Sequence, residues 1–216
     1  LAEAGTNTVI VGRRQEAGDV VVETIRKKGH KAMFVQADVL DEQSLLQAKE
    51  KILGEFGSID ILVNSAGGNL PGAVIMPEQN FFDLKMDEFQ KVVDLNLKGT
   101  VLPTKIFCDV MASRKKGVII NIASMASFRP ITRVVGYSAS KAAVDNFTQW
   151  LSVEMAKKFG EGIRVNAIAP GFFITEQNRK LLTNPDGTYT LRGEAAIRQT
   201  PFGRFGLPDE LIGTLI

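Results

Sequence analysis

The 216-residue chain has one cysteine, Cys108, and one histidine, His30. A lone cysteine excludes an internal disulfide framework and a metal cluster held by cysteines, and a lone histidine excludes metal sites built on histidine pairs. A serine nucleophile activated by a histidine base is also disfavoured. We therefore expect no bound metal, and any acid–base chemistry must come from other side chains.

The sequence also lacks an excess of one charge and any long apolar run. Lys and Arg total 26 against 24 Asp and Glu, and no basic stripe of the kind that binds nucleic acid is present. No apolar run approaches the roughly 20 residues of a membrane span, and no signal peptide is recognisable. We expect no nucleic-acid or membrane partner and a cytoplasmic location. Because the chain begins at Leu1, we expect that this is not the natural start.

The apolar residues alternate between short runs and segments of helical spacing. The expected strands are 8–12, 32–36, 59–63, 118–123 and 163–168, and the expected helices are 15–28, 41–56, 86–113 and 136–159. Strands that are apolar on both faces and alternate with helices favour a parallel sheet covered on both sides. With right-handed crossovers this is a Rossmann-like, doubly wound α/β fold, expected as a single domain over residues 1–216.

Three strands are followed by residues typical of binding sites. Asn64, Ser124 and Pro170 lie at or just past the carboxyl ends of their strands. In open α/β sheets ligands bind beyond these ends, so we expect the three residues at one edge of the sheet.

Two irregular stretches, 65–85 and 170–193, are long enough to be functional. We interpret the second as a lid, because Phe172 and Phe173 would be costly to leave exposed. A plain surface excursion is the alternative.

Tyr137 and Lys141 are four residues apart on an expected helix, so they share a face. A phenol titrates near pH ~10, but a nearby ammonium favours the phenolate and can lower that pKa by roughly 1–3 units. The pair therefore predicts a general acid–base, and the Ser124 hydroxyl could polarise a carbonyl beside it. An ordinary solvated helix face is the alternative, since so short a motif also recurs by chance.

Five segments together resemble motifs of the short-chain dehydrogenase/reductase family. They are Asn64-Ser65-Ala66-Gly67, Asn96-Leu97-Lys98-Gly99, the strand 118–124 ending in Ser124, Tyr137-Ser-Ala-Ser-Lys141, and Arg164 to Gly171 followed by Thr175. They occur in the family's order and spacing from about residue 8 to residue 216. One small departure is Ser65, which replaces the second asparagine of the strand-end motif.

The resemblance implies hydride transfer between a nicotinamide cofactor and a carbonyl–alcohol pair. Tyr137 would exchange a proton with the substrate oxygen, Lys141 would assist the tyrosine and bind the nicotinamide ribose, and Ser124 would hold the carbonyl. Asn96 would kink its helix and anchor a water that connects Lys141 to solvent. A cofactor-binding protein without catalysis is the alternative, and the intact catalytic set argues against it.

The resemblance also implies the cofactor contacts. They are Gly12, Arg13, Arg14, Asp38, Val39, Asn64, Ala66, Gly67, Tyr137, Lys141, Pro170, Gly171, Phe173 and Thr175. Relatives that prefer NAD carry an Asp where this chain has Gly12, and a guanidinium such as Arg13 or Arg14 can clamp a 2′-phosphate. We therefore expect NADP(H) ahead of NAD(H). Arg13 stacking on the adenine of either cofactor is the alternative.

The family's first strand with its glycine-rich phosphate loop, and its last strand, are not recognisable in the chain. That loop normally presents backbone N–H groups to the pyrophosphate. We therefore expect the domain to be incomplete at both ends and unstable alone.

The substrate loops 67–72 and 77–84 resemble those of sugar and sugar-acid reductases, especially the fructuronate (mannonate) reductase group. Asn69 and Arg133 are the candidate substrate residues, and Arg129 or Arg179 could also meet a substrate carboxylate. Plain surface cations are the alternative. Reduction of a 3-oxoacyl thioester or a steroid-type carbonyl stays open.

The family also implies a homo-oligomer, most often a tetramer. Four apolar residues give the expected helix 136–159 more apolar surface than one sheet face needs: Phe147, Trp150, Leu151 and Met155. That excess is compatible with pairing of this helix across a subunit interface.

Overall fold

The computed structural model describes residues 1–129, 131–176 and 178–216. Its contacts divide the chain into two compact units, Leu1–Ala169 and Pro170–Ile216, and each is described by itself. The expectation of a single domain stays a prediction.

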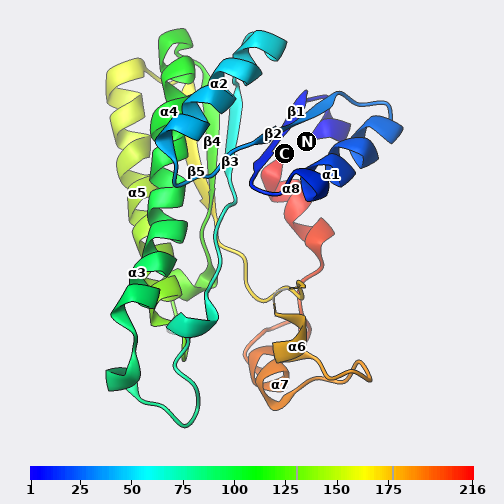
Figure 1. Ribbon diagram of the computed structural model, residues 1–216, viewed down its shortest axis with the longest axis vertical. Coiled ribbons are helices and arrows are strands. Elements are labelled where there is room, and N and C mark those ends of the chain that lie inside the picture. The colour runs from blue at the N-terminus through cyan, green and yellow to red at the C-terminus, as the bar shows by residue number, and fades with distance from the viewer. Residues whose placement is uncertain (130, 177) are drawn as a thin grey trace. The chain divides into compact units, whose positions relative to one another are not determined.

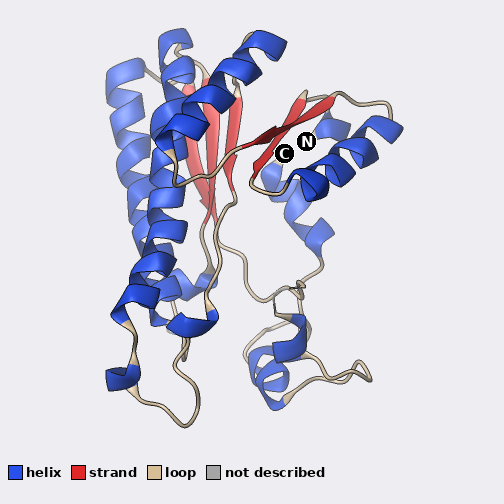
Figure 2. Cartoon of the chain, in the orientation of Figure 1, coloured by secondary structure: helices blue, strands red, loops and turns tan. Residues whose placement is uncertain are grey.

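The first unit is a parallel α/β structure (Figure 2). Its strands are β1 (Thr8–Gly12), β2 (Ala32–Gln36), β3 (Ile61–Asn64), β4 (Gly117–Ile122) and β5 (Ile163–Ile168). β1 pairs with β2, and β4 lies between β3 and β5, all in parallel. The parallel α/β fold expected from the sequence is thus confirmed.

The helices of this unit follow the expected pattern with one exception. They are η1 (Ala2–Ala4), α1 (Gln15–Lys27), α2 (Glu42–Phe56), η2 (Pro71–Ala73), η3 (Phe81–Asp83), α3 (Met86–Val93), η4 (Asp94–Lys98), α4 (Gly99–Arg114), η5 (Met125–Ser127) and α5 (Val135–Phe159). The single helix expected over 86–113 is instead α3 and α4 joined by η4, which is a π-helical turn. Such a turn inserts a residue into the helix and is common at functional sites.

Local chemistry explains where the helices begin and end. The Asp41 side chain caps α2 by accepting hydrogen bonds from the backbone N–H groups of Gln43 and Ser44. Gly57 closes the same helix with φ of 73°, a left-handed conformation that glycine adopts without strain. The strongly apolar α4 and the 25-residue α5 pack on the sheet formed by β3, β4 and β5 (Figure 1).

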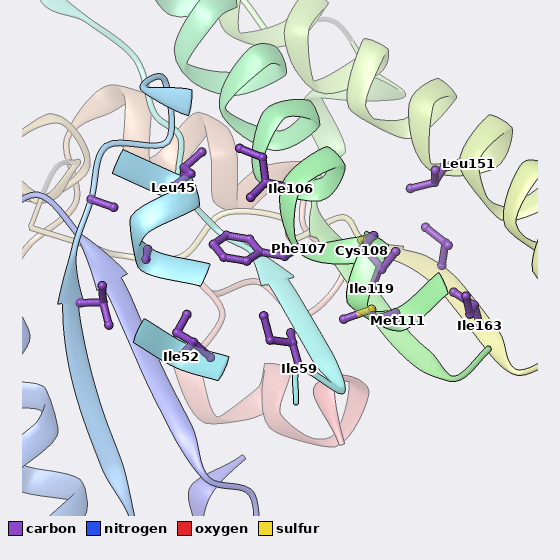
Figure 3. Packing of buried hydrophobic residues seen from close by; sticks show 14 residues of the cluster. Leu45, Ile52, Ile59, Ile106, Phe107, Cys108, Met111, Ile119, Leu151 and Ile163 are labelled. Carbon is purple, nitrogen blue, oxygen red and sulfur yellow. The ribbon is translucent and has the colours of Figure 1, made fainter. Parts of the chain in front are cut away.

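The core of the first unit lies between the helices and the sheets (Figure 3). Leu45 and Ile52 of α2 belong to one buried cluster with Phe107 and Met111 of α4, and the cluster also includes Ile119 on β4. Burial of large aliphatic and aromatic side chains of this kind contributes roughly 1.5–3 kcal/mol for each residue.

The two sheets are separated along their facing edges. A cavity of about 570 Å³ lies between β1 and β3, lined by Val9, Val11 and Leu62 among others. The described strands form no β1–β3 pair. Among the described strands, β1 and β3 therefore belong to separate sheets.

The second unit is small and mostly helical. It contains α6 (Arg179–Leu182), α7 (Leu191–Arg198), η6 (Pro208–Leu211) and α8 (Ile212–Leu215). Its apolar centre includes buried Leu182 and Phe205, and the ring of Tyr189 meets Phe205 edge to face at 5.2 Å.

Phe172 and Phe173 are both half-buried, which bears on the expected lid. Phe173 forms a β-bridge with Gly206 of the same unit, and its ring lies so close that a Cβ at Gly206 would be 2.4 Å away. Packing within this unit already covers the Phe173 ring, so the cost of exposing it no longer favours a lid, which stays a prediction.

Candidate active site

The proposed catalytic residues of the first unit gather beyond the carboxyl ends of β3 and β4. Asn64 is the last residue of β3, and Ser124 follows β4 by two residues. The buried Ser124 Oγ accepts a hydrogen bond from the backbone N–H of Ala126 at 3.1 Å and so caps η5. This bond fixes the oxygen and leaves the hydroxyl hydrogen available to a ligand.

The first two turns of α5 carry Tyr137 and Lys141 on one face. The Lys141 Nζ lies 5.7 Å from the centre of the Tyr137 ring and donates a hydrogen bond to the backbone carbonyl of Ile122 at 2.6 Å. Lys141 is only 4% exposed. Burial lowers the pKa of its ammonium to about 8, and the carboxylate of Asp145 acts in the opposite direction. A lysine with a pKa near neutrality suits proton exchange with a neighbouring phenol.

Asn96 lies in the π-helical turn η4 and is fully buried. Its amide holds the loop after β3 at two points: Nδ2 donates to the Gly68 carbonyl at 2.7 Å, and Oδ1 accepts from the Gly68 N–H at 3.0 Å. A third bond runs from Nδ2 to the Val92 carbonyl at 2.8 Å. Asn96 thus fixes the loop that enters the site.

Gly67 lies beside both Asn96 and Lys141. A Cβ placed there would lie 2.7 Å from Asn96 Oδ1 and 3.3 Å from Lys141 Nζ, so a side chain does not fit. The next residue, Gly68, has φ of 151°, which residues with side chains rarely adopt. Bare backbone beside a buried ammonium forms a cradle that fits the nicotinamide end of a dinucleotide.

The residues predicted to bind the adenosine end also lie together. Gly12 ends β1, Arg13 follows it, and Asp38 and Val39 follow β2. Arg13 Nη1 lies 3.9 Å from Asp38 Oδ2, and the Asp38 carboxylate also accepts from the backbone N–H of Leu40 at 3.0 Å. The sequence did not reveal that a carboxylate would lie beside Arg13.

Arg14 and Ala66 complete the predicted cofactor contacts of the first unit. Arg14 precedes α1 as its N-cap residue, and Ala66 adjoins the Gly67 cradle.

Four predicted cofactor residues, Pro170, Gly171, Phe173 and Thr175, belong to the second unit. Asn178 organises this segment: its Nδ2 donates to the Phe173 carbonyl and its Oδ1 accepts from the Thr175 N–H, both at 2.8 Å. Sequence reasoning missed Asn178, since an asparagine three residues past a threonine gives no distinctive signal. The role of this segment in cofactor binding stays a prediction.

Of the predicted substrate residues, Arg133 has an unusual backbone. It has φ of 74°, which is rare for a residue with a side chain, and its carbonyl accepts a hydrogen bond from the Ile75 N–H at 3.0 Å. This bond joins the irregular stretch 65–85 to the start of α5. Asn69 belongs to the same stretch, directly after Gly68. The exposed Arg129 adjoins η5, and Arg179 begins α6 in the second unit.

Within residues 1–129, 131–176 and 178–216, no group of three or more His, Cys, Asp or Glu side chains could hold a metal ion. Within the same residues no helix is both long and apolar enough to cross a membrane.

A parallel α/β fold with a Tyr–Lys pair, a serine and a glycine cradle at its strand ends defines a dinucleotide-dependent oxidoreductase. The chain belongs to the short-chain dehydrogenase family, whose family model matches residues 1–186. It is therefore a short-chain dehydrogenase/reductase enzyme that uses NAD(P).

Three relatives illustrate the breadth of this family. An uncharacterized oxidoreductase of Bacillus subtilis named UxuB is 45% identical, over all of this chain and 80% of its own length. A crystal structure of a putative D-mannonate oxidoreductase from Haemophilus influenzae with bound NAD is 40% identical with a TM-score of 0.92, over all of this chain and 79% of that one. A 3-oxoacyl-[acyl-carrier-protein] reductase of Synechocystis is 35% identical, over all of this chain and 79% of its own length.

Proposed function

We propose that this protein interconverts a carbonyl and a secondary alcohol on a sugar or sugar acid of the fructuronate–mannonate type. The observation that carries the reaction type is the buried Lys141, held beside the Tyr137 ring and the Gly67 cradle. The likeness to a putative D-mannonate oxidoreductase supports the substrate class. The small-molecule substrate would enter beside Ser124.

Each side chain of the site has a separate role in the proposed reaction. When bound, the nicotinamide cofactor supplies or accepts the hydride. The Tyr137 hydroxyl donates its proton to the carbonyl oxygen during reduction and takes it back during oxidation, and the Lys141 ammonium stabilises the phenolate. The Ser124 hydroxyl donates a hydrogen bond to the same substrate oxygen. Asn96 holds the loop through Gly68, and Gly67 would leave room for the cofactor ring because it has no side chain.

The experiment that tests this function is an activity screen with D-fructuronate, D-fructose and 5-ketogluconate. The absorbance of the reduced cofactor measures turnover of each compound. Turnover of the sugar acid that is lost in Tyr137→Phe, with cofactor binding retained, is the expected result. Binding without turnover of any carbonyl, and no effect of Tyr137→Phe, would instead favour a non-catalytic protein.

A substrate carboxylate would be met by Arg133. Its backbone is anchored by the bond to Ile75, so the guanidinium projects from a fixed point near the start of α5. Arg133→Ala should raise KM for a uronate at least about 10-fold while changing KM for a neutral ketose less than about 2-fold, since a charged hydrogen bond contributes about 1.5–3 kcal/mol. Equal effects on both substrates would refute the carboxylate contact.

A second candidate function is the reduction of 3-oxoacyl thioesters. The likeness to the Synechocystis reductase favours it, although at lower identity than the putative D-mannonate oxidoreductase. Including a 3-oxoacyl thioester in the activity screen separates the two, because a higher kcat/KM for the thioester would overturn the sugar-acid assignment.

The cofactor preference proposed here is NADP(H) ahead of NAD(H), with Arg13 and Arg14 as the phosphate contacts. Gly12 places no carboxylate directly at the end of β1, which supports this choice. Two observations weigh against it: Asp38 lies 3.9 Å from Arg13, and the Haemophilus relative was crystallised with NAD. A ratio of kcat/KM values that favours NAD would refute the NADP preference.

We also propose a homo-tetramer in which α5 contributes to an interface. Of the four apolar residues expected to form this surface, Phe147, Leu151 and Met155 instead pack in the core. Trp150 is 58% exposed and Val153 is 52% exposed on this helix, so these two supply the apolar surface. Light scattering should give four times the chain mass, and Trp150→Glu should lower it. A monomer at micromolar concentration would contradict the assembly.

A further inference from the structure

Six buried polar side chains of the first unit form one continuous chain of hydrogen bonds through its interior. They are Asn64, Asn96, Thr100, Thr104, Asn121 and Thr148, and each is at most 6% exposed. Buried polar networks are unfavourable unless their members are satisfied, and they hold their elements in one arrangement when they are. The helices and strands that this network joins are therefore held in one arrangement.

The central part of the network crosses the sheet. Asn121 Nδ2 on β4 donates to Thr148 Oγ1 on α5 at 2.9 Å, and Asn64 Nδ2 on β3 donates to Asn121 Oδ1 at 2.8 Å. Asn64 Nδ2 also donates to Thr104 Oγ1 on α4 at 2.8 Å. These bonds tie two neighbouring strands to the two helices that cover them.

From α4 the network continues to the catalytic loop. The Thr104 hydroxyl donates to the Thr100 carbonyl at 2.7 Å, and the Thr100 hydroxyl donates to the Asn96 carbonyl at 2.8 Å. The Asn96 amide in turn clasps Gly68. The network therefore ends on the loop that forms the glycine cradle.

The hydroxyl groups fix the direction of the central bonds. Thr148 donates its hydrogen to the Val144 carbonyl at 2.8 Å, so its oxygen can only accept from Asn121. The Asn121 amide must then present its NH₂ group to α5 and its oxygen to Asn64. An isosteric side chain without a hydroxyl at position 148 would leave that NH₂ group buried and unpaired.

The bond between Asn121 and Thr148 joins the two elements that carry the reacting groups. Asn121 lies three residues before Ser124 on the strand side, and Thr148 lies on the helix of Tyr137 and Lys141. A second tie between the same elements, from Lys141 Nζ to the Ile122 carbonyl, uses the ammonium that the proposed chemistry needs. The Asn121–Thr148 bond does not use the ammonium, so it persists when Lys141 Nζ takes another partner.

We propose that Asn121 and Thr148 are positioning residues that set the register of α5 on β4, and so the distance from Ser124 to Tyr137. This inference rests on the proposed function. Thr148 is seven residues, or about 10 Å along the helix, beyond Lys141, so it touches no reacting atom. Register matters because a misplacement of about 1 Å can lower a rate by about 100-fold.

The kinetic test compares Thr148→Val with Thr148→Ser, which removes a methyl group and keeps the hydroxyl. Thr148→Val should lower kcat about 10-fold or more while KM for the cofactor stays within about 2-fold, and Thr148→Ser should restore kcat to within about 2-fold of the parent. The control is Ser152→Ala, one turn further along α5, whose hydroxyl bonds only to the Gln149 carbonyl. Equal kcat values for the Val and Ser variants would overturn the proposal.

A second measurement does not depend on turnover. The chain has two tyrosines, Tyr137 and Tyr189, so the protein labelled with 3-fluorotyrosine gives two fluorine signals that Tyr189→Phe assigns. The Tyr137 signal should move or broaden in Thr148→Val and stay in place in the two control variants, Thr148→Ser and Ser152→Ala. A Tyr137 signal unmoved by Thr148→Val would overturn the positioning role.

The kinetic and the fluorine measurements distinguish a failure of the proposed function from a failure of the positioning role. If the Tyr137 signal responds as expected but no carbonyl is turned over by the parent protein, the proposed function fails and the positioning stands. If Thr148→Val does not fold, Thr148→Cys replaces it, because a thiol fits the space and is a weak acceptor. Thr148→Cys should then lower kcat more than Thr148→Ser does, and the reverse order would refute the role.

Discussion

Replacing Lys141 by methionine should make the protein more stable and inactive at the same time. The ammonium is almost fully buried, and its pKa falls from an ordinary value of 10.5 to about 8. At 1.36 kcal/mol per pKa unit, keeping the charge buried below pH 8 costs about 3 kcal/mol. Methionine fills a similar volume without a charge, and the lost hydrogen bond to the Ile122 carbonyl offsets about 1 kcal/mol of the gain. Lys141→Met should therefore unfold with a free energy about 2 kcal/mol higher at pH 6.5.

The sign of the pH dependence follows from which state holds more protons. Between pH 8 and 10.5 the unfolded lysine is protonated while the folded one loses its proton, so the stability of the parent protein rises with pH in that window. At pH 9.5 the parent recovers about 2 kcal/mol, and the advantage of the variant shrinks to near zero. Urea unfolding at pH 6.5 and 9.5 measures both differences, with the exposed Lys157→Met as the control for removing a lysine from the same helix. A variant that is less stable at pH 6.5, or whose advantage grows with pH, would refute the reasoning.

Three further predictions concern individual positions. Gly67→Ala should lower kcat/KM about 10-fold or more, because the new methyl group meets Asn96 Oδ1 at 2.7 Å. Gly54 in α2 has open space around it, so Gly54→Ala should instead raise the free energy of unfolding by about 0.5–1 kcal/mol. Asp41→Ala should destabilise the protein by about 1 kcal/mol in urea unfolding through loss of the α2 cap, and Asp41→Asn should be nearly neutral because it keeps an accepting oxygen. Cys108, whose pKa burial raises to about 12, should not react with a thiol reagent in the folded protein and should react fully once unfolded; native reaction within minutes would contradict its burial.

The regular elements were predictable because their apolar periodicity is strong. The strands β1, β2 and β5 have the predicted bounds, and α2 differs by one residue because Asp41 is its cap rather than its first turn. The π-helical turn at 94–98 agrees with the kink at Asn96 that the family resemblance implied, but the apolar spacing alone did not show it, since the apolar residues of α3 and α4 keep a helical spacing across the turn. What fixes that turn is the burial of the Asn96 amide against Gly68, a contact 28 residues away in sequence.

The proposed catalytic residues were chosen from local motifs, whereas the side chains that support them left no such signal. A threonine inside a helix, such as Thr148, reads in the sequence as a slightly unfavourable helix residue. Only the three-dimensional structure shows that the Thr148 oxygen faces Asn121. The position of Asp38 beside Arg13 is likewise visible only in the structure. Side-chain partners that lie on different elements leave no spacing signal in a single sequence.

The hydrogen-bond network supports the proposed catalytic residues through elements on one side of β3. The network runs from α5 through β4 and β3 to α4, and β4 is hydrogen-bonded on both sides. The cavity lies on the other side of β3, toward β1, where the residues proposed to bind adenosine begin. The bonds that Asn64 and Asn121 make in the network join α5, β4, β3 and α4, so the support that it gives to Ser124, Tyr137 and Lys141 does not involve β1 or β2. Changes around the cavity should therefore act on cofactor affinity through Arg13 and Asp38, and only weakly on the distance between the serine and the tyrosine.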